Sequence, residues 1–218
     1  MAPRPDRIIL LLDFDGTVTV ADVFDSIFQR FARPGWREAN RAYHREEISL
    51  EEAYRRMAEE FHGSREELME FVRATARPRP GFLELLPVLS RRSIRCRIVS
   101  NGFDLYLFPL LRAWGLDPDA LEVACHHAEI REGRFHLDFR PHPRLASSRC
   151  LIGKAEMVKE YRARGWFVVF AGDGLSDSPA AAAADLVFAR RTLAECCRRE
   201  GIDFIPFEDF YSFPARLP

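Results

Sequence analysis

Short apolar runs mark the strands of this chain. A run without polar interruption is typical of a strand that is buried on both faces of a parallel sheet. We predict such strands at 8–12, 95–99, 166–171 and 186–189. Residues 123–130 and 134–139 instead alternate between apolar and polar about Glu132 and Gly133, which predicts a β-hairpin.

Between the strands, apolar residues recur every three or four positions, which is the period of an amphipathic helix. This spacing predicts helices at 82–91, 105–114, 152–164, 178–184 and 192–199. Residues 21–75 differ, because helix follows helix there with almost no strand pattern. Ser49 with Glu52, and Ser64 with Glu67, predict capping boxes at the start of two of these helices.

Strands that alternate with helices predict an α/β fold with a Rossmann-like parallel sheet and right-handed crossovers. We expect residues 1–20 and 78–218 to form this core domain, and residues 21–77 to form a small helical domain inserted after the first strand. The Pro- and Gly-rich segment 77–81 supports a boundary there. Because the insertion leaves the sheet directly after its first strand, it is expected to lie over the strand ends as a cap.

Composition excludes several classes of function. The chain has 218 residues, of which 47% are apolar and 30% charged, as in ordinary globular proteins. Its 32 basic and 33 acidic residues nearly cancel, so there is no bulk attraction to nucleic acid or to an anionic membrane. No apolar stretch approaches the ~20 residues that span a bilayer. Without a signal peptide or a CxxC pattern among its five cysteines, a cytoplasmic location is expected.

Polar clusters follow three of the predicted strands, at 13–19, 100–102 and 172–177. Ligands of such sheets bind beyond the carboxyl ends of the strands. The first cluster contains Asp13 and Asp15, two carboxylates with an apolar residue between them. Such a pair can divide roles between a nucleophile and a general acid/base. The alternative interpretation is a turn with two solvated carboxylates.

The other two clusters predict a metal site and an anion site. Asp173 and Asp177 offer oxygen ligands that suit a hard cation, and Mg²⁺ is the usual one where phosphate is handled. Ser100, Asn101 and Gly102 offer a hydroxyl and main-chain amides for phosphoryl oxygens. Either cluster by itself could be an ordinary turn.

Lys154 stands out because all but two of the basic residues are Arg, the other Lys being Lys159. Lys154 opens a predicted helix beside the clusters, where a compact ammonium can bridge a nucleophile and a phosphate. We expect Lys159 to be solvated.

A zinc site is a weaker alternative for a second set of residues. Cys125, His126, His127 and His142 carry suitable ligand atoms. A polar strand edge is the simpler interpretation of these residues.

The order of the four motifs resembles the haloacid dehalogenase (HAD) superfamily of phosphatases. The motifs are DxDGT from Asp13, Ser-Asn at Ser100, Lys154, and GDGxSD from Gly172. A helical insert after the first motif is similar to the cap of the phosphoserine phosphatase-like branch. The second acid, Asp15, favours phosphatases over the dehalogenases, which lack it.

This resemblance implies a role for each motif residue. Asp13 would form an aspartyl-phosphate, and Asp15 would act first as general acid and then as general base. Four residues would hold Mg²⁺, namely Asp13, the main-chain carbonyl of Asp15, Asp173 and Asp177. The phosphoryl group would be bound and its charge neutralised by Ser100, Asn101, Gly102 and Lys154, with Thr17 orienting the first loop.

The substrate is then a small phosphate ester, and its identity depends on segments outside the motifs. Residues 101–104 with 108–111, and 188–190 with 207–211, resemble the methionine-salvage phosphatases that act on 2-hydroxy-3-keto-5-methylthiopentenyl-1-phosphate. The loop at 140–150 carries one Cys, where some relatives have a Cys-rich insertion. The sequence leaves the oligomeric state open.

Two alternatives remain for the function. One is a phosphatase of phosphoserine or of a phosphorylated amine, for which Asp22 would face the substrate's ammonium. The other is a non-catalytic binding module, which the intact motifs oppose. Four aromatic residues have two possible interpretations. They line the pocket, where they would favour an apolar thioether leaving group, or they belong to the hydrophobic core: Phe24, Phe28, Phe31 and Phe103.

Overall fold

The computed structural model describes residues 7–139 and 152–218. Within these residues, seven strands form one sheet in the order β4-β3-β2-β1-β5-β6-β7. Its strands are β1 (Ile8–Leu12), β2 (Arg95–Phe103), β3 (Ala124–Arg131), β4 (Arg134–Asp138), β5 (Phe167–Gly172), β6 (Leu186–Ala189) and β7 (Ile205–Pro206). Neighbouring strands are parallel except β3 and β4, which form the predicted hairpin. The α/β fold with a Rossmann-like sheet is confirmed.

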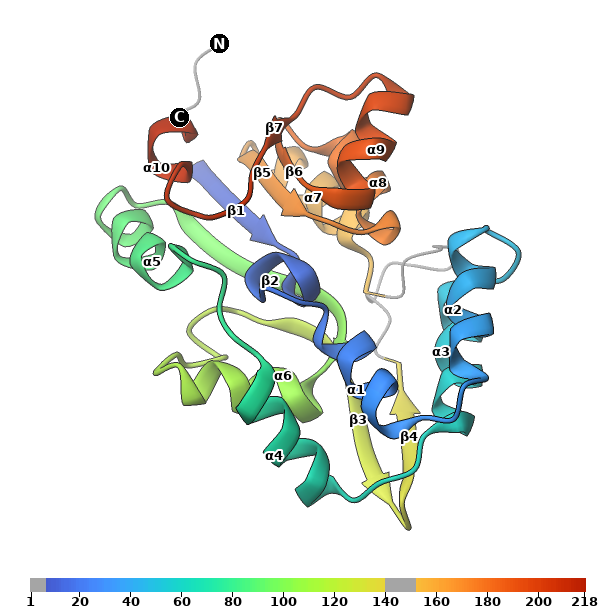
Figure 1. Cartoon of the computed structure of the whole chain (residues 1–218). Coiled ribbons are helices and arrows are strands. Elements are labelled where there is room, and N and C mark those ends of the chain that lie inside the picture. Colours follow the sequence, from blue (N-terminus) through green and yellow to red (C-terminus); the bar gives the residue numbers. More distant parts are fainter. Residues whose placement is uncertain (1–6, 140–151) are drawn as a thin grey trace.

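Strand β1 lies at the centre of the sheet, between β2 and β5 (Figure 1). Leu10 lies opposite Cys96 of β2 and Val169 of β5. All five side chains of β1 are buried, as its unbroken apolar run predicts. Because β1 is central, the residues that follow it emerge at the middle of the sheet's carboxyl edge.

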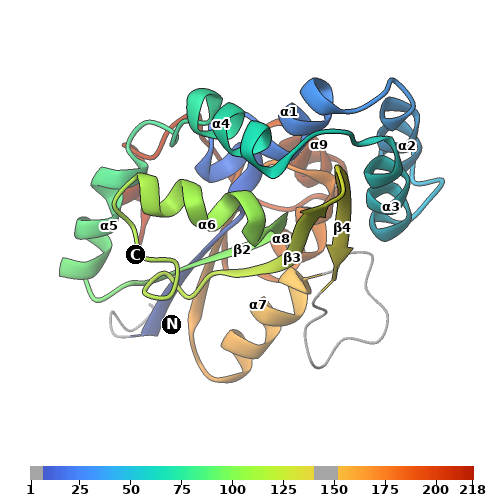
Figure 2. The same cartoon turned by 90° about the horizontal axis from the view of Figure 1, so that it is seen from below.

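Helices cover both faces of the sheet. One face carries α5 (Phe82–Arg91), α6 (Asp104–Ala113) and α10 (Phe213–Arg216), and the other carries α7 (Lys154–Ala163), α8 (Ser178–Ala183) and α9 (Arg191–Glu200). Figure 2 shows α5 and α6 on one side of the sheet and α7 on the other. Leu10 and Leu12 pack in the first hydrophobic cluster and Ile9 and Leu11 in the second, because successive side chains of a strand point to opposite faces.

Four helices follow the first strand and its loop, namely α1 (Val23–Phe31), α2 (Trp36–His44), α3 (Leu50–Glu60) and α4 (Arg65–Thr75). Ser64 and Glu67 form the predicted capping box before α4. Before α3, the Ser49 hydroxyl accepts from the Glu52 N–H at 3.1 Å, but the Glu52 carboxylate pairs with Arg56 instead of returning to the cap. The predicted box is therefore half formed there, because an (i, i+4) ion pair competes for the carboxylate.

The two segments that connect these helices to the sheet lie side by side. Thr19 and Pro78 form an antiparallel bridge, and the Arg79 N–H donates to the Val18 carbonyl at 2.7 Å. The entry to the helical segment and the exit from it are thus tied together beside the first polar cluster.

The hairpin packs against the helical segment. The ring of Phe135 in β4 lies 5.8 Å from that of Phe28 and 5.2 Å from that of Phe61, centroid to centroid. All three side chains are buried in the cluster that also contains Leu10 and Leu12 of β1. One hydrophobic core therefore extends from the sheet into the helices.

Apart from shifts of one or two residues at element ends, the structure departs from the predicted elements at β2, β7 and α10. Strand β2 continues to Phe103, beyond its predicted end at residue 99, because Phe103 still pairs with His126 of β3. Strand β7 and helix α10 were not predicted, since two and four residues are too few to establish a period. The loop predicted at 140–150 lies outside the described residues. No helix in the described part is long and apolar enough to cross a bilayer.

Candidate active site

The carboxyl ends of β1, β2 and β5 bring the three polar clusters together. Asp13 follows β1, Ser100 lies in the last part of β2, and Asp173 follows β5. These strands are adjacent in the sheet. The Asp13 N–H also donates to the Ala171 carbonyl at 2.9 Å, which fixes the first cluster against the third.

Lys154 lies between two of the acids. Its Nζ donates to Asp13 Oδ1 at 2.5 Å and to Asp177 Oδ1 at 2.6 Å. Lys154 is the first residue of α7 and is 2% exposed. A buried ammonium is costly unless it is paired and hydrogen-bonded, so these contacts hold the lysine and the acids in place together.

Asp13, Asp173 and Asp177 form a compact acidic group. Each offers a carboxylate oxygen, and these oxygens lie within 4.8 Å of one another. Burial, reinforced by the charge of Asp177, raises the pKa of Asp173 to about 6 and holds that of Asp13 well above its usual value in spite of Lys154. Close oxygen donors with this excess of negative charge fit a hard divalent cation such as Mg²⁺.

The turn Phe14–Val18 places the first motif against Asp173. Gly16 has a φ of +78°, and a Cβ at this position would collide with the Asp173 carboxylate. The Thr17 hydroxyl donates to Asp173 Oδ1 at 3.3 Å. Thr19, which lies just outside the DxDGT motif, is fully buried, and its hydroxyl accepts from the Gly16 N–H at 2.9 Å. Position 16 therefore requires glycine, because its φ is positive and because a Cβ would have no room beside Asp173.

The end of β2 is tied to the start of α7. Ser100 and Asn101 are both buried, and Ser100 Oγ accepts from the Gly102 N–H at 2.9 Å. Asn101 Oδ1 accepts from the Ile152 N–H at 3.2 Å. The Asn101 side chain thus supports the segment that positions Lys154, in addition to the phosphate role expected of its main chain.

Residues 10–182 match the family of haloacid dehalogenase-like hydrolases. The chain belongs to this family. It is 31% identical over 206 residues to a Bacillus velezensis protein named 2-hydroxy-3-keto-5-methylthiopentenyl-1-phosphate phosphatase, covering 93% of this chain and 86% of that protein. A Bacillus thuringiensis protein with the same name is 30% identical over 208 residues, covering 94% and 93%.

Solved structures of HAD phosphatases share the fold. A phosphoserine phosphatase described as a phospho-aspartyl intermediate analogue has a TM-score of 0.75 at 18% identity, covering 98% of this chain and 100% of that chain. A substrate-bound phosphoserine phosphatase complex has a TM-score of 0.73 at 17% identity, covering 97% and 99%. With the family and the phosphatase relatives, the chain is a HAD phosphatase, a phosphoric monoester hydrolase.

In this HAD phosphatase, Asp15 is held at both carboxyl oxygens. The Tyr106 hydroxyl donates to Oδ2 at 2.6 Å, and the Val23 N–H donates to Oδ1 at 3.2 Å. Burial raises the pKa of Asp15 to about 6, although both hydrogen bonds lower it. A carboxyl group with such a pKa can exchange a proton near neutral pH, as general acid/base catalysis requires.

Asp22 is engaged at the start of α1. Its Oδ1 accepts from the Asp25 N–H at 2.8 Å as the helix N-cap. Burial, followed by the charges of Asp25 and Asp15, raises the pKa of Asp22 well above its usual value. The carboxyl group that was expected to face a substrate ammonium thus already has a local structural partner.

The four aromatic residues that the sequence left open as pocket lining or core lie in the hydrophobic core. Phe24, Phe28, Phe31 and Phe103 are all buried in the cluster shared by the sheet and the helices. Tyr54 of α3, which the sequence did not single out, packs against two of them, with centroids 4.6 Å from Phe24 and 5.7 Å from Phe103. Tyr54 is partly exposed, and burial together with the charges of Asp22 and Asp15 raises its pKa. Tyr54 thus adds a hydroxyl-bearing ring to this aromatic cluster, on the side of α3.

Arg79 joins the first motif loop to both connecting segments. It is 4% exposed, and its guanidinium donates to main-chain carbonyls at 2.6–3.1 Å, those of Gly16, Thr17, Thr19, Val20 and Glu208. Burial lowers its pKa to about 10, so it stays charged at neutral pH. Sequence patterns identified 77–81 as a breaker segment and did not reveal this role, since its partners are main-chain atoms.

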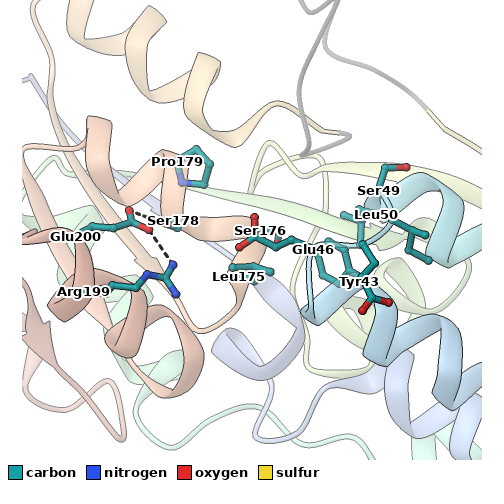
Figure 3. Close-up of a pocket in the computed structure, with 12 residues that line it drawn as sticks. Tyr43, Glu46, Ser49, Leu50, Leu175, Ser176, Ser178, Pro179, Arg199 and Glu200 are labelled. Atoms are coloured by element: carbon teal, nitrogen blue, oxygen red, sulfur yellow. Dashed lines mark hydrogen bonds and ion pairs between the residues drawn. The ribbon is translucent and has the colours of Figure 1, made fainter.

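A cavity of about 430 Å³ lies between the helical segment and the α8–α9 side of the core. The connection between α2 and α3 forms one wall, and the turn Leu175–Asp177 with α8 and α9 forms the other. Figure 3 shows Tyr43 and Ser49 across from Leu175 and Ser176. Leu175 and Ser176 lie between Asp173 and Asp177 in the chain, so the cavity adjoins the loop that carries these two acids, although neither acid lines it.

The described residues do not form the alternative zinc site. His127 Nδ1 lies 2.8 Å from the Asp104 carboxylate, and His142 lies outside the described residues. Within 7–139 and 152–218, Asp13, Asp173 and Asp177 are the one group of three potential metal ligands. The zinc interpretation is therefore not supported.

Proposed function

We propose that this phosphatase hydrolyses 2-hydroxy-3-keto-5-methylthiopentenyl-1-phosphate in methionine salvage, through an aspartyl-phosphate and with Mg²⁺. The contact of Lys154 with Asp13 and Asp177 is the observation that carries the chemistry. The substrate is supported by the names of relatives that are 31% and 30% identical over almost the whole chain.

Asp13 is the proposed nucleophile. Its in-line attack forms a bond from a carboxylate oxygen of Asp13 to phosphorus, which gives an acyl phosphate, and breaks the bond from phosphorus to the leaving oxygen. The attack opposes like charges, and each pair of unit charges ~4 Å apart costs about 4 kcal/mol at an effective dielectric of ~20. Lys154, whose Nζ lies 2.5 Å from Asp13 Oδ1, is positioned to offset part of that repulsion.

Mg²⁺ would be held by Asp13, Asp173, the main-chain carbonyl of Asp15 and Asp177, the last directly or through water, and would supply positive charge to the phosphoryl oxygens. The phosphoryl group itself would be bound by the Ser100 hydroxyl and the main-chain N–H groups of Asn101 and Gly102. The Thr17 hydroxyl, which donates a hydrogen bond to Asp173, would hold the first motif loop in place against the acidic group.

Asp15 is the proposed general acid and base. It would protonate the leaving oxygen as the ester bond breaks, and then remove a proton from the water that attacks the aspartyl-phosphate. Its pKa of about 6 supports both steps near neutral pH.

Residues 21–77 are proposed to act as a cap on a core domain of residues 1–20 and 78–218. The pairing of Thr19 with Pro78 supports a compact boundary between the two. A cap in this place would exclude water until the leaving group has departed, and would determine which leaving group is accepted.

Phosphoserine or a phosphorylated amine is the second candidate substrate. Asp22 supports it, because a carboxylate near Asp15 could meet a substrate ammonium. The N-cap bond of Asp22 to Asp25 opposes it, because that carboxylate already has a partner.

Phosphate release from the methionine-salvage ester, phosphoserine and phosphoethanolamine, each with Mg²⁺ and with EDTA, tests the proposal. We expect kcat/KM for the methionine-salvage ester to exceed that for phosphoserine by at least ~10-fold, or about 1.4 kcal/mol in transition-state binding. EDTA should abolish turnover. Asp13→Asn should lower kcat by at least ~10³-fold, as loss of a nucleophile does, whereas Asp203→Asn, at an exposed acid, should not.

The outcomes separate the substrate from the mechanism. A preference for phosphoserine would contradict the methionine-salvage assignment and leave the mechanism intact. Near wild-type turnover by Asp13→Asn would contradict the aspartyl-phosphate itself.

A further inference from the structure

Tyr106 makes a short hydrogen bond to Asp15 inside the core. Its hydroxyl lies 2.6 Å from Asp15 Oδ2, and its side chain is fully buried. Tyr106 lies in the first turn of α6, directly after the end of β2. Side chains of a helix tilt towards its N-terminus, which directs this hydroxyl back to the strand ends.

Gly102 makes room for this contact. A Cβ on Gly102 would lie 2.5 Å from Asp15 Oδ2 and would collide with the Tyr106 hydroxyl. The glycine of the expected phosphate-binding segment therefore has a second consequence, because without a side chain it lets Tyr106 and Asp15 meet.

The two carboxyl oxygens of Asp15 are held from different helices. Oδ2 accepts from Tyr106 of α6, and Oδ1 accepts from the Val23 N–H at the start of α1. The terminal torsion of an aspartate is otherwise broad, so two donors on opposite oxygens restrict the orientation of the carboxyl plane. The bond to Oδ2 is much the shorter, at 2.6 Å against 3.2 Å.

We propose that Tyr106 is a positioning residue that fixes the Asp15 carboxyl group for proton transfer to the leaving oxygen. This inference rests on the proposed role of Asp15. Tyr106 keeps its own proton and holds Oδ2 with the shorter bond, whereas the Val23 N–H holds Oδ1 with the longer one, which favours Oδ1 as the oxygen that carries the transferred proton. As the bond from phosphorus to the leaving oxygen breaks, that proton moves to the leaving oxygen, and Asp15 later regains one from the attacking water.

Tyr106→Phe tests this role, because it removes one oxygen atom and keeps the ring. We would measure kcat with Mg²⁺ on an alkyl phosphate that the wild type cleaves and on p-nitrophenyl phosphate. An alkoxide leaving group needs a proton and a nitrophenolate needs little, so we expect a loss of ~10-fold for the alkyl ester and less than ~2-fold for the nitrophenyl ester. The ratio of the two rates on one preparation does not depend on the folded fraction.

Two further variants complete the test. Tyr161→Phe removes the hydroxyl of another buried tyrosine, on α7, and should leave the ratio unchanged. In an Asp15→Asn background, Tyr106→Phe should add no further selective loss, because the two residues act as a pair.

The outcomes distinguish this inference from the proposed function. If Asp15→Asn is selective for the alkyl ester but Tyr106→Phe loses both rates equally or neither, Tyr106 is structural and the inference is wrong. If Asp15→Asn is itself not selective, the proposed role of Asp15 fails and the inference fails with it.

Discussion

Lys154 provides a positive charge that two buried acids share. Its Nζ bonds Asp13 and Asp177 from a position that is 2% exposed, in a chain whose other basic residues are Arg except for Lys159. An ammonium is a compact charge with three donors, whereas a guanidinium is a planar fork that needs more room. The use of Lys at this position is therefore explained by the narrow space between two carboxylates.

Replacing Lys154 by Arg should keep the positive charge but disturb the two short hydrogen bonds to Asp13 and Asp177. We expect Lys154→Arg to lower kcat/KM by ~10²-fold, the usual scale for a displaced donor at a developing charge. Lys159→Arg is the matched control, because the Lys159 side chain is 66% exposed, and its rates should be unchanged. Wild-type kcat/KM in Lys154→Arg would show that charge alone is sufficient.

The placement of candidate site residues that follow a strand end could be predicted from the sequence, whereas contacts between residues far apart in the chain could not. Asp13 and Asp173 follow apolar runs, and parallel topology brings those ends together. Tyr106 and Arg79 contact the first motif from 91 and 62 positions away. No local pattern signals such contacts, because they exist only once the helices have packed.

Among the elements, the two connections between the helical segment and the sheet depend on Arg79. Its guanidinium satisfies carbonyls of the first motif loop, of the first connection and of the C-terminal segment before α10. Without Arg79, these carbonyls would lose this donor, and most of them are buried. A buried carbonyl without a hydrogen-bond donor costs about 1–3 kcal/mol. Arg79 thus ties the geometry of the site to that of the connections.

Arg79→Met should therefore destabilise the protein and impair catalysis together. We expect a loss of at least about 3 kcal/mol in the free energy of unfolding, or at least roughly 6 °C in Tm for a chain of this length. Arg91→Met, at an exposed position of α5, should change Tm little. Thermal unfolding and kcat below Tm would both be measured, and an unchanged Tm in Arg79→Met would contradict the role of these bonds.

At the same scale, periodicity predicted which elements form better than where they pack. Helix 82–91 and strands 8–12 and 186–189 occur at their predicted bounds. The contact of Phe135 with Phe28 and Phe61 could not be predicted, because alternation shows that a face is apolar and does not identify its partner. For the same reason, Phe28 and Phe31 could be read either as core or as pocket.

For the whole molecule, the buried acids make stability depend on pH and on metal. Burial raises the pKa of Asp15 and of Asp173 to about 6, against 3.8 for an ordinary Asp. The folded state therefore holds these protons more tightly than the unfolded chain does. Their contribution to stability is complete below about pH 4 and is lost as the pH rises through about 6.

In EDTA, these groups should lower Tm as the pH rises from about 5 to about 7.5. Mg²⁺ should offset this loss, since it favours the ionised acids, so its stabilising effect should be larger at the higher pH. Asp173→Asn should raise Tm in EDTA at about pH 7.5, by roughly 2–4 °C per kcal/mol recovered, and should remove most of the response to Mg²⁺. A Mg²⁺ response of equal size in Asp173→Asn would contradict the site.

The shared core of the hairpin and the helices limits how such an enzyme can diverge. Phe135 belongs to the sheet, yet its ring completes the packing of Phe28 and Phe61. Exchanging residues 21–77 for the corresponding segment of a relative would replace Phe28 and Phe61, the ring partners of Phe135. Side chains of other shapes in their place would create cavities or clashes around Phe135. Under the proposed role of residues 21–77 as a cap, new leaving-group preferences would then arise more readily from single substitutions on the helices, or from inheriting helices and hairpin as one unit.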